Sequence, residues 1–170
     1  DKVARVLGLG YPGGPLIDKL AKEGNPHAVE FKRVFLEKGS LDFSFSGLKS
    51  AVLNYLNTEE IAGRSICVPD VAASFQKSVV EVLVGHAMAA AKEYHCSRFA
   101  LAGGVASNSA LRAAAKEACE ENGITFYCPP PILCTDNAAM IACAGYYDYL
   151  HGKRSGLDLN AVPNLALGDA

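Results

Sequence analysis

The longest regular pattern of apolar residues runs from about Pro69 to His95. Apolar or weakly polar side chains recur there at steps of three and four residues, as expected for the buried face of an α-helix. The members of this stripe are Val71, Phe75, Val79, Val82, His86 and Ala90. The spacing therefore predicts one long amphipathic helix as the largest element of the chain.

Two short apolar runs have a different character. Residues 98–102 end in Gly103-Gly104, and residues 124–128 end in the proline run 129–131. Continuous apolar runs of this length, bounded by turn residues, are typical of buried strands in a parallel sheet. We predict two short strands that run parallel to each other.

Shorter helices surround these strands. Glycine, asparagine and proline mark where several of them end, and side-chain oxygens mark where two of them begin. The predicted segments are the end of a helix in 1–8, a helix over 15–23, one from Gly47 to about Asn57 capped by Ser46, one over 107–121, and one capped by Thr135 or Asp136 that ends near Leu150. The alternation of apolar and polar residues over 41–45 predicts a short extended piece.

These elements predict an α/β fold that is mostly helical with a short partial sheet. A sheet usually needs three or more strands for stability, so we expect further strands from a segment upstream. The first residues resemble the middle of a helix and include no initiator methionine, which favours a chain that begins inside a longer protein. We expect a lobe over residues 1–152 and a loose tail over 153–170.

The composition limits the classes of protein that fit. The 170 residues carry a net charge of -2 with a pI near 6.1, so nucleic-acid binding would need a local patch or another chain. Six cysteines occur without a C-x-x-C pair, which argues against a zinc ribbon and favours a reducing cytosol. No apolar run reaches the roughly 18 residues of a membrane span, and no signal peptide is visible.

The turn after the first predicted strand is a candidate ligand site. Gly103 and Gly104 let a backbone approach a ligand, and the following helix start offers unpaired N–H groups at the positive end of its dipole. Asn108 can hydrogen-bond the edges of a sugar or a base. An ordinary strand-to-helix turn that uses glycine for packing explains the same residues, so both interpretations stay open.

Two further turns place a carboxylate near a helix start. Asp136 follows the loop after the second strand, where it could ligate a metal ion or only cap the helix. Asp18 lies one turn after the glycine-proline turn 11–15, which suits a ribose or amide ligand and equally a plain turn with a solvated aspartate. Cys134 has no histidine near it in sequence, so we expect it to be structural.

Other polar residues carry weaker signals. The four histidines are scattered without an H-x-x-x-H or H-E-x-x-H pair, so we expect them on the surface or in the core. Lys49 could contact phosphate, but a solvated lysine near a helix start explains it as well. The sequence contains neither a G-x-S-x-G elbow nor a Walker A motif.

Four motifs in one order make the sequence resemble a known family. They are Tyr11-Pro12-Gly13-Gly14-Pro15, Asp42-Phe43-Ser44-Phe45-Ser46-Gly47-Leu48-Lys49, Ala102-Gly103-Gly104-Val105-Ala106-Ser107-Asn108 and Cys134-Thr135-Asp136-Asn137-Ala138-Ala139-Met140-Ile141-Ala142. Together they resemble the TsaD family, the tRNA N6-adenosine threonylcarbamoyltransferases, once called O-sialoglycoprotein endopeptidases. The resemblance covers nearly the whole chain, from Asp1 to about Gly152.

The resemblance implies a fold and an activity. The fold is the actin/Hsp70/sugar-kinase-like (ASKHA) ATPase fold, in which two lobes close on a nucleotide, and this chain resembles its C-terminal part. The activity is that of an acyltransferase, which moves the threonylcarbamoyl group from threonylcarbamoyl-AMP to N6 of adenosine 37 in tRNAs that read codons beginning with A. The expected partners are tRNA and TsaB and TsaE-type proteins in the cytoplasm, without a membrane.

The same resemblance implies roles for individual residues. Asp1, Gly14, Asp18 and Asn108 would contact the adenylate, Gly103 and Gly104 would let the backbone approach it, and Asp136 would ligate a single divalent metal ion, iron or zinc. The family's other metal ligands, two histidines in an H-x-x-x-H segment, are absent from this sequence. Because such sites need three or more protein ligands, we expect the isolated chain to bind metal weakly and to lack transferase activity.

Two other interpretations remain open. Another ASKHA ATPase or sugar kinase would use Gly103-Gly104 as its adenosine loop, but the motifs over 42–49 and 134–142 speak against it. A non-catalytic scaffold paralogue would have lost the metal carboxylate and the glycine loop, and both are present here.

Overall fold

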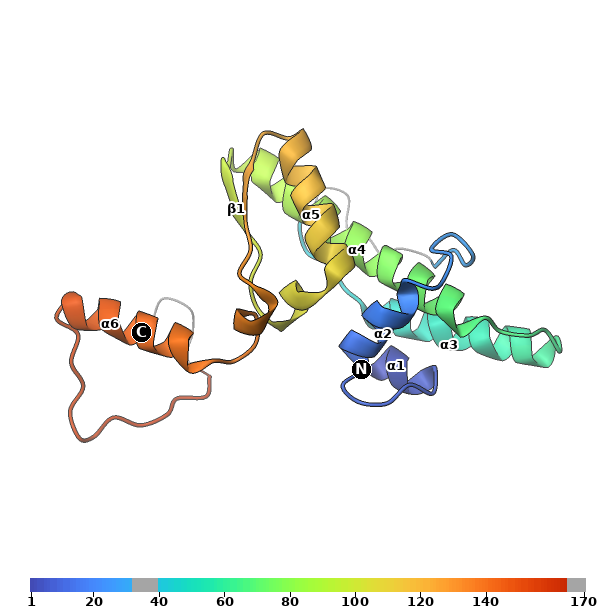
Figure 1. The fold of residues 1–170 in the computed structure, drawn as a ribbon, viewed down its shortest axis with the longest axis horizontal. Coiled ribbons are helices and arrows are strands. Elements are labelled where there is room, and N and C mark those ends of the chain that lie inside the picture. The colour runs from blue at the N-terminus through green and yellow to red at the C-terminus, as the bar shows by residue number, and fades with distance from the viewer. Residues whose placement is uncertain (32–39, 165–170) are drawn as a thin grey trace. The chain divides into compact units, whose positions relative to one another are not determined.

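The computed structural model describes residues 1–31 and 40–164, which form a mostly helical chain with one small sheet (Figure 1). The elements in chain order are α1 (Lys2–Val6), α2 (Gly13–Ala21), α3 (Ser46–Ile61), α4 (Val68–Glu93), β1 (Arg98–Ala100), the 3₁₀ turn η1 (Gly104–Ser107), α5 (Ser109–Glu121), β2 (Thr125–Tyr127), the 3₁₀ turn η2 (Pro131–Leu133) and α6 (Ala138–Leu150). Asp1–Thr135 forms one compact unit and Asp136–Ala170 a second.

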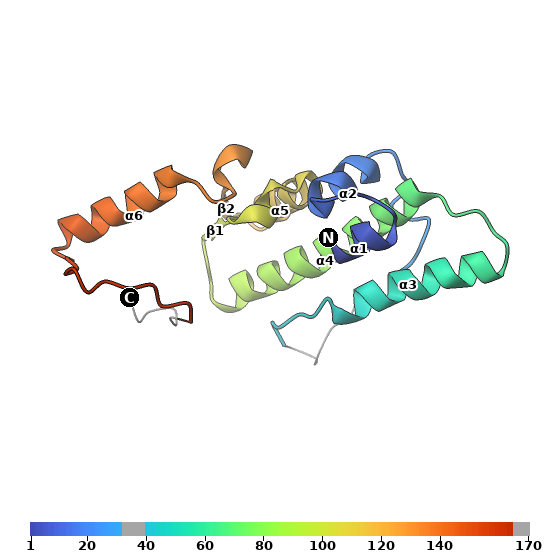
Figure 2. The ribbon, with the colours of Figure 1, turned by 90° about the horizontal axis from the view of Figure 1, so that it is seen from below.

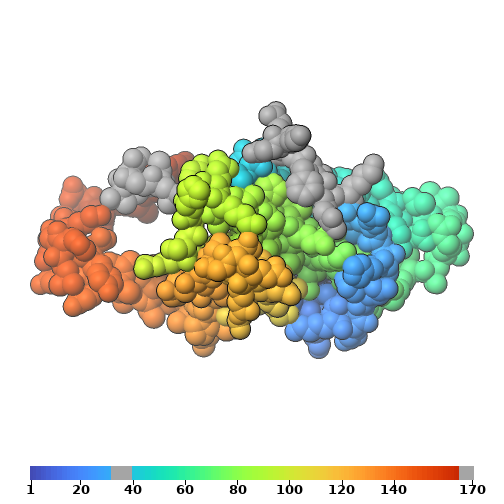
Figure 3. Space-filling view, turned by 90° about the horizontal axis from the view of Figure 1, so that it is seen from above, coloured from blue at the N-terminus to red at the C-terminus, as the bar shows by residue number. Residues whose placement is uncertain are grey.

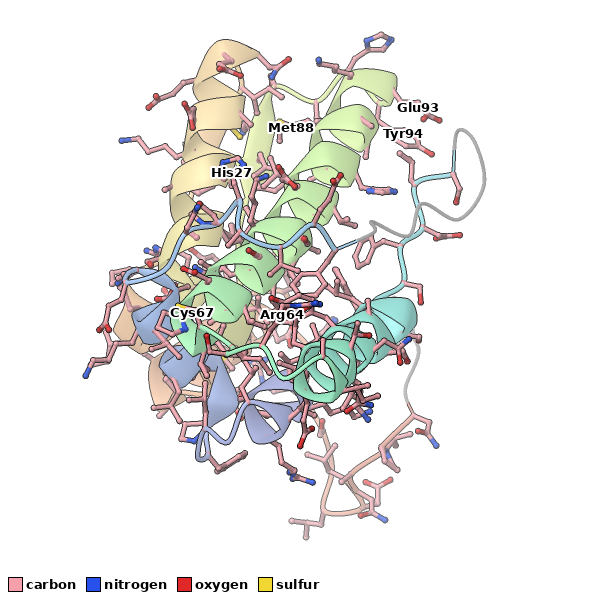
Figure 4. All side chains as sticks on the ribbon, turned by 90° about the vertical axis from the view of Figure 1, so that its right-hand side faces the viewer. His27, Arg64, Cys67, Met88, Glu93 and Tyr94 are labelled. Carbon is pink, nitrogen blue, oxygen red and sulfur yellow. The ribbon has the colours of Figure 1, made fainter. Side chains whose placement is uncertain are left out.

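The long helix predicted from apolar periodicity is confirmed as α4. Cys67 stands just before its first residue and Glu93 is its last, and both are labelled in Figure 4. Near its start, the Asp70 carboxylate accepts a hydrogen bond from the Asn25 backbone N–H at 2.7 Å. This hydrogen bond, with a second contact from the Cys67 side chain, holds the pKa of Asp70 below its ordinary value. The contact ties the turn after α2 to the beginning of α4.

The main core lies where α1, α2, α3 and α4 meet. Its buried members are Val3, Ala4, Ile17, Phe31, Leu48, Val52, Val71 and Ala72. Figure 2 shows α2 and α5 along one side of α4 and α3 along the other. Burying a valine, leucine, isoleucine or phenylalanine side chain contributes about 1.5–3 kcal/mol, so the larger members of this cluster each stabilise the first unit.

The sheet consists of two parallel strands, as predicted. Their register pairs Arg98 with Thr125, Phe99 with Phe126 and Ala100 with Tyr127. α5 makes the crossover between them, which is the usual way to join neighbouring parallel strands. The rings of Phe99 and Phe126 stack with their centres 6.2 Å apart. Among the described residues this is the one sheet. Because the two strands are parallel, the loops that follow them leave the sheet at the same end.

Local predictions around α3 are wrong in their details. Ser46 is the first residue of α3 and not its cap, because Phe45 occupies the cap position. The Ser44 hydroxyl instead accepts a hydrogen bond from the Ser46 N–H at 3.3 Å. The extended piece expected over 41–45 is reduced to a single bridge residue, Phe43. The rings of Phe43 and Phe45 lie in contact, with their centres 5.6 Å apart.

A largely apolar cavity of about 300 Å³ lies between α4, β1, α5 and the segment around Phe43. His86 forms part of its wall and is buried, with Nδ1 2.8 Å from the Val82 carbonyl oxygen. The edge of its ring also meets Phe43, with centres 5.9 Å apart. Figure 3 shows α4 in green packed directly against α5 in yellow and orange. His86 is therefore a core residue, which agrees with the expectation that each histidine lies either on the surface or in the core.

The second unit contains α6 and the tail. α6 is capped by Asn137, whose Oδ1 accepts a hydrogen bond from the Met140 N–H at 2.9 Å, so the cap is later than either predicted residue, Thr135 or Asp136. α6 has no buried residue. No helix in the part of the chain that the structure describes is long and apolar enough to cross a membrane. A lobe over 1–152 with a tail over 153–170 stays a prediction.

Candidate functional site

One face of α4 forms an apolar wall. Phe75, Val79 and Leu83 recur at helical spacing along this face, and Gln76 stands beside them as an amide. The wall is completed by Ile17 of α2, and by Val80, Val105 and Leu111. An apolar surface bordered by an amide suits a heteroaromatic ring, because the ring can pack on the apolar side chains and hydrogen-bond at its edge.

Asn108 stands at the N-terminus of α5, beside this wall. Its Oδ1 accepts a hydrogen bond from the Leu111 backbone N–H at 2.9 Å, which caps the helix. Its Nδ2 donates to Oε1 of Gln76 at 2.8 Å. Asn108 therefore joins α5 to α4 and holds its amide in a defined orientation at the rim of the wall.

Asp18 connects α2 to the same helix start. Its Oδ1 accepts hydrogen bonds from the Ser109 hydroxyl at 2.8 Å and from the Ser109 backbone N–H at 3.2 Å. Its other oxygen lies 3.9 Å from the Lys22 ammonium. A carboxylate at a helix N-terminus also interacts favourably with the helix dipole. The contacts of Asp18 in this structure thus position the start of α5.

Asp1 occupies the corresponding place at the start of α2. Its Oδ1 accepts a hydrogen bond from the Gly13 N–H at 2.7 Å. Gly13 is buried, and a Cβ there would come within 2.5 Å of the Ala4 Cβ and 2.8 Å of the Asp1 Cα. The neighbouring Gly14 faces open space. The first glycine therefore allows close packing, and the second leaves room beside the helix start.

These groups meet at a cavity of about 140 Å³. Asp1, Gly14 and Asn108, three of the six residues expected to contact the adenylate, all line it. Ligand pockets of about 300–1,000 Å³ are typical for drug-sized molecules, so this cavity is large enough for part of a nucleotide. The structure thus brings together residues that are up to about a hundred positions apart in sequence.

The other three expected residues lie outside the lining of that cavity. Gly103 has a φ of 85°, in the region that favours glycine, and an added Cβ would meet nothing within 4 Å at Gly103 or Gly104. Val105, one residue further on, does line the cavity. Asp18 reaches the cavity only through Ser109 and the helix that it positions. The glycine loop therefore leads into the site and leaves its backbone accessible.

Sequence reasoning missed Gln76. Apolar periodicity identified the neighbouring Phe75 and Val79 as members of the buried face of α4 and gave no role to the amide between them. A single polar side chain bordering an apolar helix face is the signal that points to it, because such a group needs a hydrogen-bond partner once it is half-buried.

A second polar arrangement joins the loops that follow the two strands. Arg112 of α5 donates to the Ala106 carbonyl oxygen at 2.8 Å and to the Pro129 carbonyl oxygen at 2.6 Å. The same guanidinium lies 3.5 Å from Sγ of Cys134, which is buried. The buried position agrees with the structural role predicted for Cys134. Arg112 therefore fixes the glycine loop relative to the loop after β2.

The family is decided by comparison with known sequences. The sequence model of the TsaD family, described as tRNA N6-adenosine threonylcarbamoyltransferase, matches residues 1–143. This chain belongs to the TsaD family. The match includes all four motifs that carried the resemblance.

Curated relatives in the TsaD family are named tRNA N6-adenosine threonylcarbamoyltransferase. Those of Clostridioides difficile (strain 630) and Desulfitobacterium hafniense (strain Y51) are each 59% identical over 167 residues, which is 98% of this chain and 49% of each relative. The relative of Clostridium botulinum (strain Hall) is 58% identical over 169 residues, which is 99% of this chain and 50% of that protein. The chain therefore spans about half the length of the curated relatives it matches.

Asp136 is the one metal ligand that the TsaD resemblance implies for this chain. The alternative that it caps α6 is wrong, because Asn137 makes that cap. Among residues 1–31 and 40–164, no group of three or more His, Cys, Asp or Glu side chains could hold a metal ion. The described residues therefore bring no such group of three together around Asp136.

Proposed function

We propose that this chain is the adenylate-binding part of a tRNA N6-adenosine threonylcarbamoyltransferase with the ASKHA fold. The observation that carries the proposal is the cavity at which Asp1, Gly14 and Asn108 meet. The TsaD family model and the names of the relatives support it. The substrates would be threonylcarbamoyl-AMP and a tRNA.

In the proposed reaction, the chain contributes binding and orientation. The N6 amine of adenosine attacks the carbamoyl carbon, the bond from that carbon to the adenylate oxygen breaks, AMP leaves, and the amine loses a proton to solvent. Asn108 would hydrogen-bond the adenosine part of the ligand. The Asp1 carboxylate oxygen that is not bonded to the Gly13 N–H would accept a hydrogen bond from a ribose hydroxyl. Holding the mixed anhydride in one geometry lowers the barrier by removing much of its freedom before the reaction.

The glycine residues would let the phosphate and ribose of the ligand approach the protein backbone. With no Cβ at Gly103 or Gly104, phosphate or ribose oxygens can approach the chain closely beside η1. Gly14 gives the same clearance at the start of α2. Asp18, one turn further along α2, would hold the start of α5 that carries Asn108.

Metal, partner proteins and location are further parts of the proposal. Asp136 would supply one ligand to an iron or zinc ion whose remaining ligands come from outside the described residues. TsaB and TsaE-type proteins would be the partners, in the cytoplasm. We expect the chain of residues 1–170 alone to bind iron or zinc weakly and to be inactive, which metal analysis after dialysis and a tRNA modification assay would test.

The activity can be tested in a fusion that joins the first half of the Clostridioides difficile relative to this chain. We expect the fusion to transfer radiolabelled threonylcarbamoyl from threonylcarbamoyl-AMP to tRNA. Asn108→Asp keeps an oxygen to cap α5 and removes the amide donor, so KM for the adenylate should rise about tenfold or more. Asn122→Asp, at the other end of α5, is the matched control and should leave KM unchanged. Phosphorylation of a sugar by ATP, without transfer to tRNA, would establish the kinase alternative instead.

A further inference from the structure

Gln76 is placed where it can act on the ligand site through a neighbour. It lies on α4, is half-buried, and lines the same cavity as Asn108. Its Oε1 accepts a hydrogen bond from Nδ2 of Asn108 at 2.8 Å, although the two residues are 32 positions apart. This contact spans two helices and ends at the side chain on which the proposed adenylate site depends.

The hydrogen-bond chain through Asn108 has one consistent direction. The Leu111 N–H can only donate, so the Asn108 atom that faces it must be Oδ1. Nδ2 then faces Gln76, and the Gln76 atom that receives its hydrogen must be Oε1. Both amides are therefore oriented by a single backbone N–H at the start of α5. One N–H of Asn108 and both N–H groups of Gln76 remain to donate to a ligand.

The two amides consequently present N–H donors to a ligand in the cavity, which the Asp1 carboxylate also lines. The ring nitrogens of an adenine base are acceptors, whereas a protonated ring nitrogen would meet these donors unfavourably. If Gln76 were apolar, Nδ2 of Asn108 would lose its acceptor, and the Asn108 side chain would be held only by its cap bond.

We propose that Gln76 is a positioning residue, which fixes the amide of Asn108 so that its remaining N–H group meets an acceptor on the adenine ring. This inference rests on the proposed function, because it concerns how that same cavity recognises the base. Gln76 acts through its acceptor oxygen, and its own N–H groups are not required. A glutamate at this position should therefore replace it, whereas an apolar side chain of similar length should not.

The test uses the full 170-residue chain and adenosine as the ligand. Adenosine has no phosphate, so the carboxylate introduced by Gln76→Glu or Asn108→Asp does not repel the ligand. Gln76→Met should weaken adenosine binding roughly tenfold, as expected for the loss of one well-placed hydrogen bond. Gln76→Glu should stay within about threefold of the unchanged chain. Glu93→Met, at the far end of the same helix, is the control and should have no effect (Figure 4). Isothermal titration measures all of these dissociation constants.

A second measurement distinguishes a positioning role of Gln76 from a role in stability alone. In ¹⁵N NMR spectra, the side-chain N–H exchange of Asn108 should be slow in the unchanged chain and in Gln76→Glu, and fast in Gln76→Met. A double-mutant cycle with Asn108→Asp should show that the two effects on adenosine binding are not additive. This measurement stands even if Gln76→Met proves too unstable for titration, because Gln76→Ala also removes the acceptor and can replace it.

The outcomes separate the inference from the proposal beneath it. If Asn108→Asp weakens adenosine binding and Gln76→Met does not, the role of Gln76 is wrong and the proposed site stands. Equal losses in Gln76→Glu and Gln76→Met would show direct contact with the base and overturn the positioning role. If the unchanged chain binds no adenosine, or if Asn108→Asp binds it normally, the proposed function of this cavity fails and the inference fails with it.

Discussion

The region built from α2, α4 and α5 differs from α6 in how apolar residues are distributed around each helix. α4 buries one face, and polar groups such as Gln76 border it and have partners. α6 has apolar or aromatic residues on all sides, only one charged residue, and no buried residue. A helix that is apolar all round is normally enclosed by other elements. The first region thus carries its own core, whereas α6 has the composition of a helix that needs neighbours.

The largest expected effect on stability is at Gly13, where the first region is closely packed. Gly13→Ala forces a Cβ against Ala4 and Asp1, so we expect a loss of up to about 3 kcal/mol in the free energy of unfolding. Gly14→Ala meets no atom and should leave stability within about 0.5 kcal/mol, while it narrows the cavity and weakens adenosine binding. Urea unfolding measures both, and equal stabilities for the two variants would contradict the packing around Gly13.

A core truncation compares the two regions directly. Val71 is 1% exposed, and Val71→Ala should lower the free energy of unfolding by about 2 kcal/mol through lost burial and a cavity. Ile141 on α6 is 66% exposed, and Ile141→Ala should change stability by less than about 0.5 kcal/mol. If Ile141→Ala cost as much as Val71→Ala in urea, α6 would have a core of its own and the comparison would fail.

The next effect concerns the loops that follow the strands. Arg112→Met removes two hydrogen bonds to carbonyl oxygens and should lower stability by about 1.5 kcal/mol. It should also speed amide exchange over residues 103–107 and 129–134, which mass spectrometry can follow. Lys116, one turn along α5, pairs only at the surface with Glu120, so Lys116→Met is the control. Unchanged amide exchange in Arg112→Met would show that the two loops keep their conformation without the Arg112 hydrogen bonds.

The smallest effect depends on pH. The pKa of Asp70 is lowered, first by the Asn25 backbone N–H and then by the Cys67 side chain. A lowered pKa means that the ionised carboxylate stabilises the fold above the unfolded value of about 3.9, and that this contribution is lost as pH falls through the folded value. Asp70→Asn should therefore be less stable than the unchanged chain at pH 7, and the two should converge below about pH 4 in thermal unfolding. A difference that persisted at low pH would assign the effect to packing.

Much of the fold could be predicted because periodicity reports burial directly. The stripe from Val71 to Ala90 located α4, and the two apolar runs located β1 and β2 in their parallel arrangement. Helix starts were less accurate. Asn137 and not Asp136 caps α6, since several consecutive residues could supply an oxygen and only the backbone geometry selects one.

The candidate site could be predicted only in part. Asp1, Gly14 and Asn108 came from the motifs of the TsaD family, and the structure places them at one cavity. Gln76 and Arg112 belong to no motif of the prediction, because their roles follow from contacts between helices that are distant in sequence. Spacing along the chain carries no information about such contacts, so these residues appear only once the helices are packed.

The hydrogen bonds between Asp18 and Ser109 also govern when the site can form. They join positions 91 residues apart, so α2 is complete long before its partner exists. At synthesis rates of about 5–20 residues per second, the ribosome needs roughly 5–20 s to add the intervening segment. During that interval α2 can pack against α1 and against the following helices as they emerge. The cavity lined by Asp1, Gly14 and Asn108 therefore cannot close until the start of α5 has been synthesised, after α1–α4 have emerged.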